Sequence, residues 1–329
     1  MEETEPELEP PRSAHLGSYK GEVRLVESAS EEVMLLWGLG QPASQRHNAF
    51  VRQSSHTLSL DCCDRRLTLL QSPSSMSTPG VTGAVMWDSG VVLAKFLEHA
   101  VDSGQLVLKG TRVVELGAGC GLAGIVAALL GADVVLTDLP DRLKLLKKNV
   151  DENVGDGPPR CSARVDELTW GDDIDSALVE PSHPNFVIGS DVIYNEEAVN
   201  DLLTTLKQLC GPHTTILLAG ELRNDVVLEC FLEAAMEEFT IGCIDQQKWH
   251  PDFMSNRVAL FVLVKKVDAP TQTDYNNLLF VPIKFNFFNV LYYRNVNLEL
   301  MIMILLLPGL RSLIVIFLVF CCRMFSNCK

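Results

Sequence analysis

The stretch that decides the fold of this chain runs from Val113 to Gly121 and reads VVELGAGCG. A short apolar run ends in an acidic residue, glycines follow at every second position, and an apolar run with helical spacing begins at Leu122. This pattern predicts a strand, a tight glycine turn and the start of a helix. Glycine allows the positive φ angles of such a turn and lets a ligand approach the backbone closely. The free N–H groups at the start of the helix suit the polar or anionic end of a nucleotide-like ligand.

Two kinds of cofactor loop fit this turn. Residues 119–124, GCGLAG, match the dinucleotide-binding pattern G-x-G-x-x-G, which is weak evidence on its own. The turn also matches E-x-G-x-G-x-G, the loop of class I methyltransferases, which bind S-adenosylmethionine (SAM). Glu115 favours this second pattern, because an acid at the end of the first strand faces the methionine end of the cofactor in those enzymes and is usually missing from dinucleotide folds. A glycine turn without a ligand is the third alternative.

A second acid follows where an adenosine-binding fold needs one. Residues 133–138, DVVLTD, predict the second strand, and Asp138 lies about 20 positions beyond the glycine turn. A carboxylate there can accept hydrogen bonds from both ribose hydroxyls. Because Pro140 and a helical pattern follow, Asp138 could also cap a helix, and both roles can hold together.

Strand and helix patterns alternate from Arg112 onward. The predicted strands are 112–116, 133–137, 162–166, 185–190 and 214–219, and the predicted helices are 121–130, 141–150, 197–209 and 225–238. This alternation predicts a parallel sheet covered on both faces. Two further β patterns, 240–247 and 257–265, have no helix between them and predict a terminal antiparallel hairpin. We therefore predict an α/β fold with a Rossmann-like, seven-stranded, mostly parallel sheet, although another doubly wound enzyme fits the same topology.

The rest of the chain is predicted to fall into distinct segments. They are an acidic, disordered N-terminus (1–18), an N-terminal β extension with a loop (19–82), the domain of the α/β sheet (83–268) and an atypical hydrophobic tail (269–329). Asp88 and Ser89 are expected to cap the first helix of that domain.

The tail contains an almost wholly apolar stretch, residues 301–322, that is interrupted by Pro308, Gly309 and Arg311. About 20 such residues can span a bilayer, but an arginine near the middle costs about 2.5–3.5 kcal/mol on insertion scales. A membrane segment is therefore the less favoured interpretation. We favour translated noncoding sequence, because the tail residues are those that A/T-rich codons encode; sequencing of transcripts across codon 269 distinguishes the two.

Charge and cysteine content restrict the partners and the compartment. The net charge of −15 argues against a nucleic-acid backbone as the main partner and is compatible with a basic protein. The ten cysteines include no C-x-x-C pair. Two pairs are adjacent in the sequence, Cys62-Cys63 and Cys321-Cys322, and adjacent cysteines seldom form a disulfide with each other or bind one zinc ion together. No metal site is therefore predicted. The acidic start resembles no secretory signal, so we expect a cytoplasmic protein that could also enter the nucleus.

Four motifs in order reveal a resemblance to a known family. They are VMWDSG (85–90), ELGAGCG (115–121) with Asp138 after it, LTWG (168–171) and SDVIY (190–194). With these motifs the chain resembles the seven-β-strand protein-lysine methyltransferases with a DxxY motif (methyltransferase family 16), the group of the methyltransferase-like protein 21 members and the valosin-containing-protein lysine methyltransferase. The resemblance covers about residues 67–266. It implies SAM-dependent methylation of a lysine in a protein such as a chaperone or an AAA-type ATPase.

The resemblance also implies a set of cofactor-binding residues. Trp87 would line the cofactor site, Trp170 would lie beside the adenine, and Ser190 would contact the cofactor from the end of the fourth strand. Either tryptophan could instead be a packed core aromatic. The full predicted set is Trp87, Glu115, Gly117, Ala118, Gly119, Asp138, Trp170 and Ser190.

Asp191 and Tyr194 are the signature of this family, and the resemblance implies that they are catalytic. They follow the fourth predicted strand, at the sheet edge where open α/β folds bind ligands, and their i, i+3 spacing can place both on one face of a turn. We expect Asp191 to accept a hydrogen bond from the substrate amine and Tyr194 to shape a narrow lysine channel. The alternative is a helix cap at Asp191 and packing at Tyr194.

A further segment, AGELR (219–223), resembles a family segment beside the active site and could serve the substrate or form a Glu–Arg pair. We expect a monomer. Two other functions stay open: a small-molecule methyltransferase on the same fold, and a noncatalytic protein that binds SAM or a partner.

Overall fold

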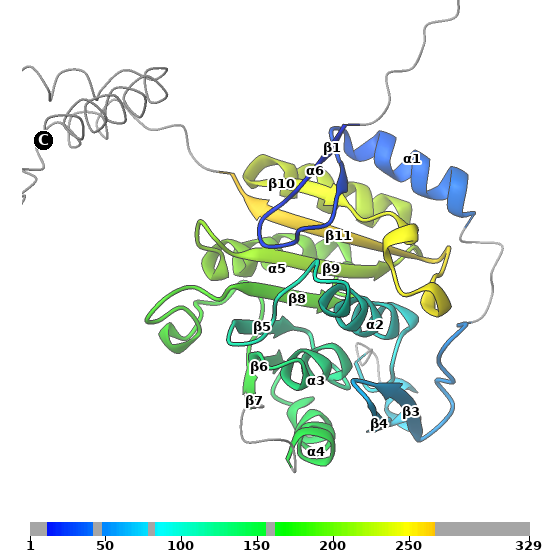
Figure 1. Cartoon of the computed structure of the whole chain (residues 1–329), viewed down its shortest axis with the longest axis vertical. Helices are drawn as coiled ribbons and strands as arrows, with labels where there is room; N and C mark the ends of the chain where they lie inside the picture. Colours follow the sequence, from blue (N-terminus) through cyan, green and yellow to red (C-terminus); the bar gives the residue numbers. More distant parts are fainter. Residues whose placement is uncertain (1–11, 42–47, 78–82, 156–161, 267–329) are drawn as a thin grey trace, which may run out of the picture. The chain divides into compact units, whose positions relative to one another are not determined.

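A nine-stranded sheet forms the centre of the part of the chain that the computed structural model describes, residues 12–41, 48–77, 83–155 and 162–266 (Figure 1). The strand order is β1-β2-β10-β11-β9-β8-β5-β6-β7. In that order the strands span Ser13–Ala14, Val23–Leu25, Phe239–Cys243, Val258–Lys265, Thr215–Glu221, Phe186–Ser190, Arg112–Leu116, Asp133–Asp138 and Ser162–Glu167.

The seven strands from β5 to β11 confirm the predicted sheet. Strands β5 to β9 pair in parallel, while β11 runs antiparallel to both β9 and β10. The parallel strands carry continuous apolar runs because both faces of the sheet are covered. In β8, for example, the first four residues, Phe186 to Gly189, are all buried.

Helices cover the sheet on both faces (Figure 1). One core cluster contains the apolar residues of α2, α3 and α4, and a second contains those of α1, α5 and α6. The helices span α1 Ala29–Gly40, α2 Asp88–Asp102, α3 Leu122–Leu129, α4 Leu143–Val154, α5 Glu196–Leu209 and α6 Asp225–Glu238. The four helices predicted after the first strand are confirmed to within a few residues, since their apolar periodicity was strong.

The N-terminal region differs from the predicted β extension in two ways. Strand β1 lies within residues 1–18, where disorder was predicted, and together with β2 it extends the sheet beyond β10. Residues 29–40 form helix α1 instead of a strand. The hydroxyl of Ser28 caps this helix by accepting the N–H of Glu31, and Val33 is buried against the α5–α6 face of the sheet. Glu, Met and Leu favour helix in this segment, and their signal was overlooked beside the alternating residues around it.

Residues 57–70 form a hairpin of the kind that their alternation predicts, with β3 Thr57–Cys62 and β4 Arg65–Leu70. This hairpin is a separate two-stranded sheet that packs on α4. The side chain of Asn149 accepts the N–H of Leu70 at 2.8 Å, and that of Asn153 accepts the N–H of Thr68 at 2.9 Å. Two buried amides of α4 therefore take the place of a neighbouring strand along β4.

The prediction that Asp88 and Ser89 cap helix α2 is wrong. Trp87 occupies the cap position and makes no side-chain cap hydrogen bond. The carboxylate of Asp88 accepts instead the backbone N–H groups of Ala49, at 2.6 Å, and Phe50, at 3.1 Å. Asp88 thus fastens an N-terminal segment to the start of α2.

Other predicted features lie outside the described residues. They include the first eleven residues and the tail with its apolar stretch 301–322. Within the described ranges, no helix is long and apolar enough to cross a bilayer.

Candidate active site

The carboxyl ends of the parallel strands meet at a cavity of about 550 Å³. Strand β5 lies between β6 and β8, so the strand order reverses there, and open α/β sheets bind ligands at this kind of reversal. The residues that follow β5, β6 and β8 all contribute to the cavity wall. The sheet topology therefore brings together motifs that are far apart in the sequence.

The glycine turn after β5 forms one wall of the cavity. Gly117, Gly119 and Gly121 have φ angles of 58°, 56° and 84°, which is the left-handed region that glycine tolerates. A Cβ atom on Gly117 would lie 3.1 Å from the ring of Trp170, and one on Gly119 would lie 3.0 Å from the carbonyl oxygen of Gly83. Both positions therefore need glycine for space as well as for conformation.

Asp138 lies at the end of β6 and faces the same cavity. Its carboxylate accepts the N–H of Gly119 at 2.6 Å and that of Leu139 at 2.7 Å, which ties the glycine turn to β6. Burial raises the pKa of this carboxyl above its usual value, while these two hydrogen bonds oppose the shift. Each carboxylate oxygen keeps a further lone pair, so Asp138 can still accept hydrogen bonds from a ligand.

Glu115 is the one predicted cofactor residue that does not line the cavity. On β5 its side chain shares the α2–α4 face with Val113, while Val114 and Leu116 belong to the opposite face. The carboxylate accepts the N–H of Gly124, in α3, at 3.0 Å. Burial raises the pKa of Glu115 to about 8. The strand alternation thus places Glu115 behind the glycine turn, outside the lining of the cavity.

Asp191 follows β8 directly and is held in one orientation. Its φ angle of 59° turns the backbone sharply after Ser190, and 6% of its side chain is exposed. One carboxylate oxygen accepts the N–H of Glu221 at 3.0 Å, and the other accepts Nη2 of Arg223 at 2.7 Å. Burial raises the pKa of Asp191, and the positive charge of Arg223 opposes this. Asp191 is no helix cap, because Asn195 caps α5.

Tyr194 lies on the wall of the same cavity and is 45% exposed. Its ring centroid is 6.4 Å from that of Trp170, with a tilt of 54° between the rings. Burial of part of the ring raises the pKa of the phenol. The two aromatic rings thus lie side by side in the wall of the cavity.

The AGELR segment forms no Glu221–Arg223 pair, and each of these side chains has another partner. Glu221 pairs with Arg257 at 3.2 Å and accepts the N–H of Asp88 at 3.0 Å. Burial and the nearby charge of Asp191 raise the pKa of Glu221 to about 7. The guanidinium of Arg223 lies 4.3 Å from the centre of the Trp87 ring. Arg223 thus connects Asp191 with a tryptophan of the predicted cofactor site.

The structure brings together all other predicted site residues in this single cavity. They are Trp87, Gly117, Ala118, Gly119, Asp138, Trp170, Ser190, Asp191 and Tyr194. Sequence analysis missed several further lining residues, including Gly83, Met86, Arg142 and Asn224. In the sequence, the only indication that these residues line the site is that each lies close to one of the motifs. Arg142, for example, comes four residues after Asp138, and Asn224 follows the AGELR segment directly.

Comparison with known proteins identifies the family. Residues 68–238 match the model of a family described as lysine methyltransferase. The chain belongs to the lysine methyltransferase family. This confirms the resemblance drawn from the motifs and excludes the dinucleotide-binding alternative for the glycine turn.

Several members of the lysine methyltransferase family are close in sequence. The protein N-lysine methyltransferase METTL21A of Danio rerio is 43% identical over 158 residues, which are 48% of this chain and 69% of the relative. METTL21A of Mus musculus is 44% identical over 161 residues, with the same shares of the two chains. EEF1A lysine methyltransferase 3 of Mus musculus is 39% identical over 176 residues, which are 54% of this chain and 70% of the relative.

SAM is the cofactor of this family member, and the cavity fits it. A methyl donor of this kind has a flat purine, a ribose with two hydroxyls and a charged amino-acid end. The cavity offers the indole of Trp170, the carboxylate of Asp138 and a turn whose left-handed glycines allow close backbone approach. Trp87 and Ser190 complete the lining on the side of α2 and β8.

Proposed function

We propose that this lysine methyltransferase positions the side chain of a substrate lysine with Asp191 and Tyr194 in the cavity at the carboxyl end of β8. The observation that carries the proposal is a carboxylate, fixed by two hydrogen bonds, on the wall of the cavity that also contains the glycine turn and Asp138. SAM supplies an electrophilic methyl group whose sulfonium leaves as a neutral thioether. The protein must therefore hold the amine in a near-attack geometry, which requires about 3–3.5 Å between the reacting atoms.

Asp191 suits the task of orienting the amine better than that of removing its proton. Each of its oxygens accepts one hydrogen bond within the protein and keeps a lone pair for the substrate. A bare carboxylate stabilises the charged ammonium and so opposes its deprotonation. The guanidinium of Arg223 offsets part of this negative charge. Asp191 can then accept a hydrogen bond from the amine without fixing it as ammonium.

The rest of the wall supports the same function. The half-exposed ring of Tyr194, tilted against Trp170, lines the same cavity as Asp191 and suits the wall of a channel for the lysine side chain. Four acidic residues, Asp138, Asp191, Asp201 and Glu221, line the cavity beside two basic residues, Arg142 and Arg223, and this excess of carboxyl groups favours entry of a cationic side chain.

The test is methylation of proteins in a cell extract by the purified full chain with tritiated SAM. We expect one or a few labelled protein bands, lost with Asp191→Asn, while calorimetry shows that this variant still binds SAM. Label in small molecules alone would favour a metabolite methyltransferase. SAM binding without any label would favour a noncatalytic protein, and full activity of Asp191→Asn would refute the assignment of Asp191.

The substrate class and the setting are also part of the proposal. The first proteins to test are a chaperone and an AAA-type ATPase, which the family resemblance implies, and EEF1A, which the name of one relative gives as its substrate. We propose a monomer that acts in the cytoplasm, with the nucleus as a second compartment, and without nucleic acid or a membrane as partner. The net charge of −15 supports a basic protein surface as the partner.

A further inference from the structure

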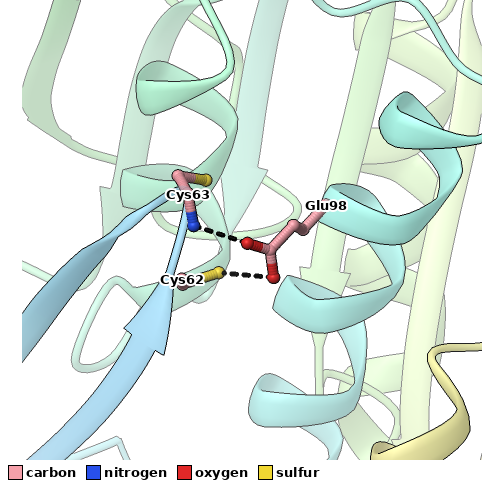
Figure 2. Close-up of side chains that lie close together, drawn as sticks. All are labelled: Cys62, Cys63 and Glu98. Carbon is pink, nitrogen blue, oxygen red and sulfur yellow. Dashed lines mark hydrogen bonds between the residues drawn. The ribbon is translucent and has the colours of Figure 1, made fainter.

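Two cysteines and a glutamate form a cluster away from the catalytic cavity (Figure 2). Cys62 ends β3, Cys63 begins the turn to β4, and Glu98 lies on α2. One ligand atom from each of the three residues lies within 4.8 Å of the other two. None of the three lines the cavity described above, so the catalytic function does not account for them.

The turn conformation explains why two adjacent side chains converge. Neighbouring residues of an ordinary strand point to opposite faces of the sheet. Cys63 and Asp64 have φ angles of 54° and 57°, as in a two-residue hairpin turn of the left-handed type. This turn ends the alternation after Cys62. The expectation from the sequence that an adjacent cysteine pair seldom binds one zinc ion did not take this turn into account.

The carboxylate of Glu98 is held between the hairpin and its own helix. Oε2 accepts the thiol of Cys62 at 3.3 Å and Nζ of Lys95 at 2.7 Å. Oε1 accepts the backbone N–H of Cys63. Nζ of Lys95 also donates to the carbonyl oxygen of Asp61, so the lysine is fixed beside the cluster.

We propose that Cys62, Cys63 and Glu98 bind a thiophilic divalent cation of the Zn²⁺ class and so fasten the β3–β4 hairpin to α2. Zinc takes thiolate sulfur at about 2.3 Å and carboxylate oxygen at about 2.0–2.2 Å, so the ligand atoms of a tetrahedral site lie about 3.4–3.8 Å apart. The spread of the three atoms needs only small side-chain rotations. The described residues supply three ligands, which leaves the fourth tetrahedral position to solvent beside the half-buried Cys63.

When the metal ion binds, the bonds broken and formed and the charges of the ligands balance. Two S–H bonds break, two sulfur–metal bonds form, and two protons go to solvent. Two thiolates and one carboxylate then face one divalent cation, and the ammonium of Lys95 neutralises the remaining negative charge. Loss of the Cys62 proton also removes one donor from Oε2 of Glu98 and leaves this oxygen free to bind the ion. Lys95 keeps its hydrogen bond to Glu98 and orients it, as outer-shell partners of metal ligands do.

The test uses the full chain under reducing conditions, with Cys321→Ser and Cys322→Ser to remove the other adjacent cysteine pair. Cd²⁺ is the probe, because its bonds to thiolate give an ultraviolet charge-transfer band. We expect one equivalent of Cd²⁺ per chain, displaced by Zn²⁺ only when Zn²⁺ is in excess, and a melting temperature that rises with the metal concentration.

Three variants separate this site from other thiols. Cys63→Gly keeps the left-handed turn and the backbone N–H, and it should weaken binding by more than the roughly 10–100-fold that loss of an outer-shell partner costs. Lys95→Met should keep the stoichiometry and weaken binding by about 10–100-fold. Cys230→Ser, which removes a half-buried thiol outside the cluster, should change nothing.

Two results would overturn the proposal. One is the absence of a stoichiometric Cd²⁺–thiolate band in a chain that still binds SAM. The other is a band of equal strength and affinity in Cys63→Gly. Circular dichroism and SAM calorimetry on every variant confirm folding, so that loss of the band is assigned to the ligand. Glu98→Gln, with an amide of the same shape, provides a second measurement at the third ligand.

Discussion

Arg223 donates a hydrogen bond to the carboxylate of Asp191 at 2.7 Å across the cavity wall. The same guanidinium lies on the ring of Trp87, at 4.3 Å from its centre. One positive side chain therefore connects the predicted catalytic carboxylate with a residue of the predicted cofactor site. Because Asp191 directly follows β8 and Arg223 lies just beyond β9, the parallel pairing of the two strands brings these two residues together.

Replacement of Arg223 by Met should change the pH dependence of methyl transfer. Without the guanidinium, the uncompensated negative charge of Asp191 favours the ammonium form of the bound lysine, so the pKa of that amine rises. The acidic limb of the kcat profile should then move to higher pH, and kcat at neutral pH should fall about tenfold for each unit by which the limb moves. Profiles of kcat against pH, at saturating substrate, measure this.

Arg223→Lys is the matched control, because it keeps the charge and loses the planar contact with Trp87. Its profile should lie near that of the wild type, even if SAM binds less tightly. If the kcat profile of Arg223→Met has its acidic limb at the same pH as the wild type and only a lower maximum kcat, Arg223 acts through packing alone.

Replacement of Asp191 by Asn should remove most of the methyl transfer and leave the fold intact. Asn tolerates the left-handed backbone at this position, and its amide oxygen can still accept one of the two internal hydrogen bonds. We expect kcat to fall by about 10²–10³-fold, the range for loss of one preorganised hydrogen-bonding group at the reacting atoms. Single-turnover kinetics measure the loss, and calorimetric SAM affinity should equal that of the wild type. A fall in SAM affinity alone would place Asp191 in cofactor binding.

Much of this site could be predicted from the sequence because its elements are local. The glycine turn, Asp138 and the signature around Asp191 each lie at the end of an apolar strand with strong periodicity. The direction of the Glu115 side chain could not be predicted in this way, since it depends on which face of β5 each residue occupies. The partners of Glu221 and Arg223 depend on long-range contacts with Arg257 and Asp191.

Two features of the N-terminal region also could not be predicted from local sequence patterns. Helix α1 is short and is stabilised by packing on α6, which a local pattern does not reveal. The convergence of Cys62 and Cys63 depends on a left-handed turn at two residues other than glycine. Such a conformation is uncommon for these residue types, so alternation alone predicts the wrong side for one of the two thiols.

Glu115 should make the protein less stable as the pH rises. Its pKa is about 8 in the folded chain, against a reference value near 4.5. Between these values the unfolded chain releases the proton while the folded chain retains it, so the free energy of unfolding falls with rising pH. The contribution is fully present below about pH 4.5 and is lost as the pH approaches 8. The full difference between the two pKa values corresponds to about 5 kcal/mol.

Glu115→Gln removes this titration and can still accept the N–H of Gly124 with its amide oxygen. Urea unfolding at intervals from pH 5 to pH 8 should show a smaller decline for the variant than for the wild type. Asp138 and Glu221 also have raised pKa values, but they are present in both proteins, so the difference between the two curves isolates Glu115. Parallel curves would mean that Glu115 is ionised in the folded chain.

Gly117→Ala should lower the affinity for SAM, and Gly104→Ala should not. Both glycines have left-handed φ angles, 58° and 73°, so alanine strains the backbone at each by about 1–2 kcal/mol. A Cβ atom on Gly117 would lie 3.1 Å from the Trp170 ring and 3.2 Å from Val192, whereas one on Gly104 would meet nothing within 4 Å. The two variants should thus have similar melting temperatures, and the added crowding at Gly117 should make that of Gly117→Ala the lower of the two.

Only Gly117→Ala displaces the indole that lines the cavity, and we expect its calorimetric SAM affinity to fall at least about tenfold, or about 1.4 kcal/mol. Equal SAM affinities in the two variants would show that the turn and Trp170 do not hold the cofactor.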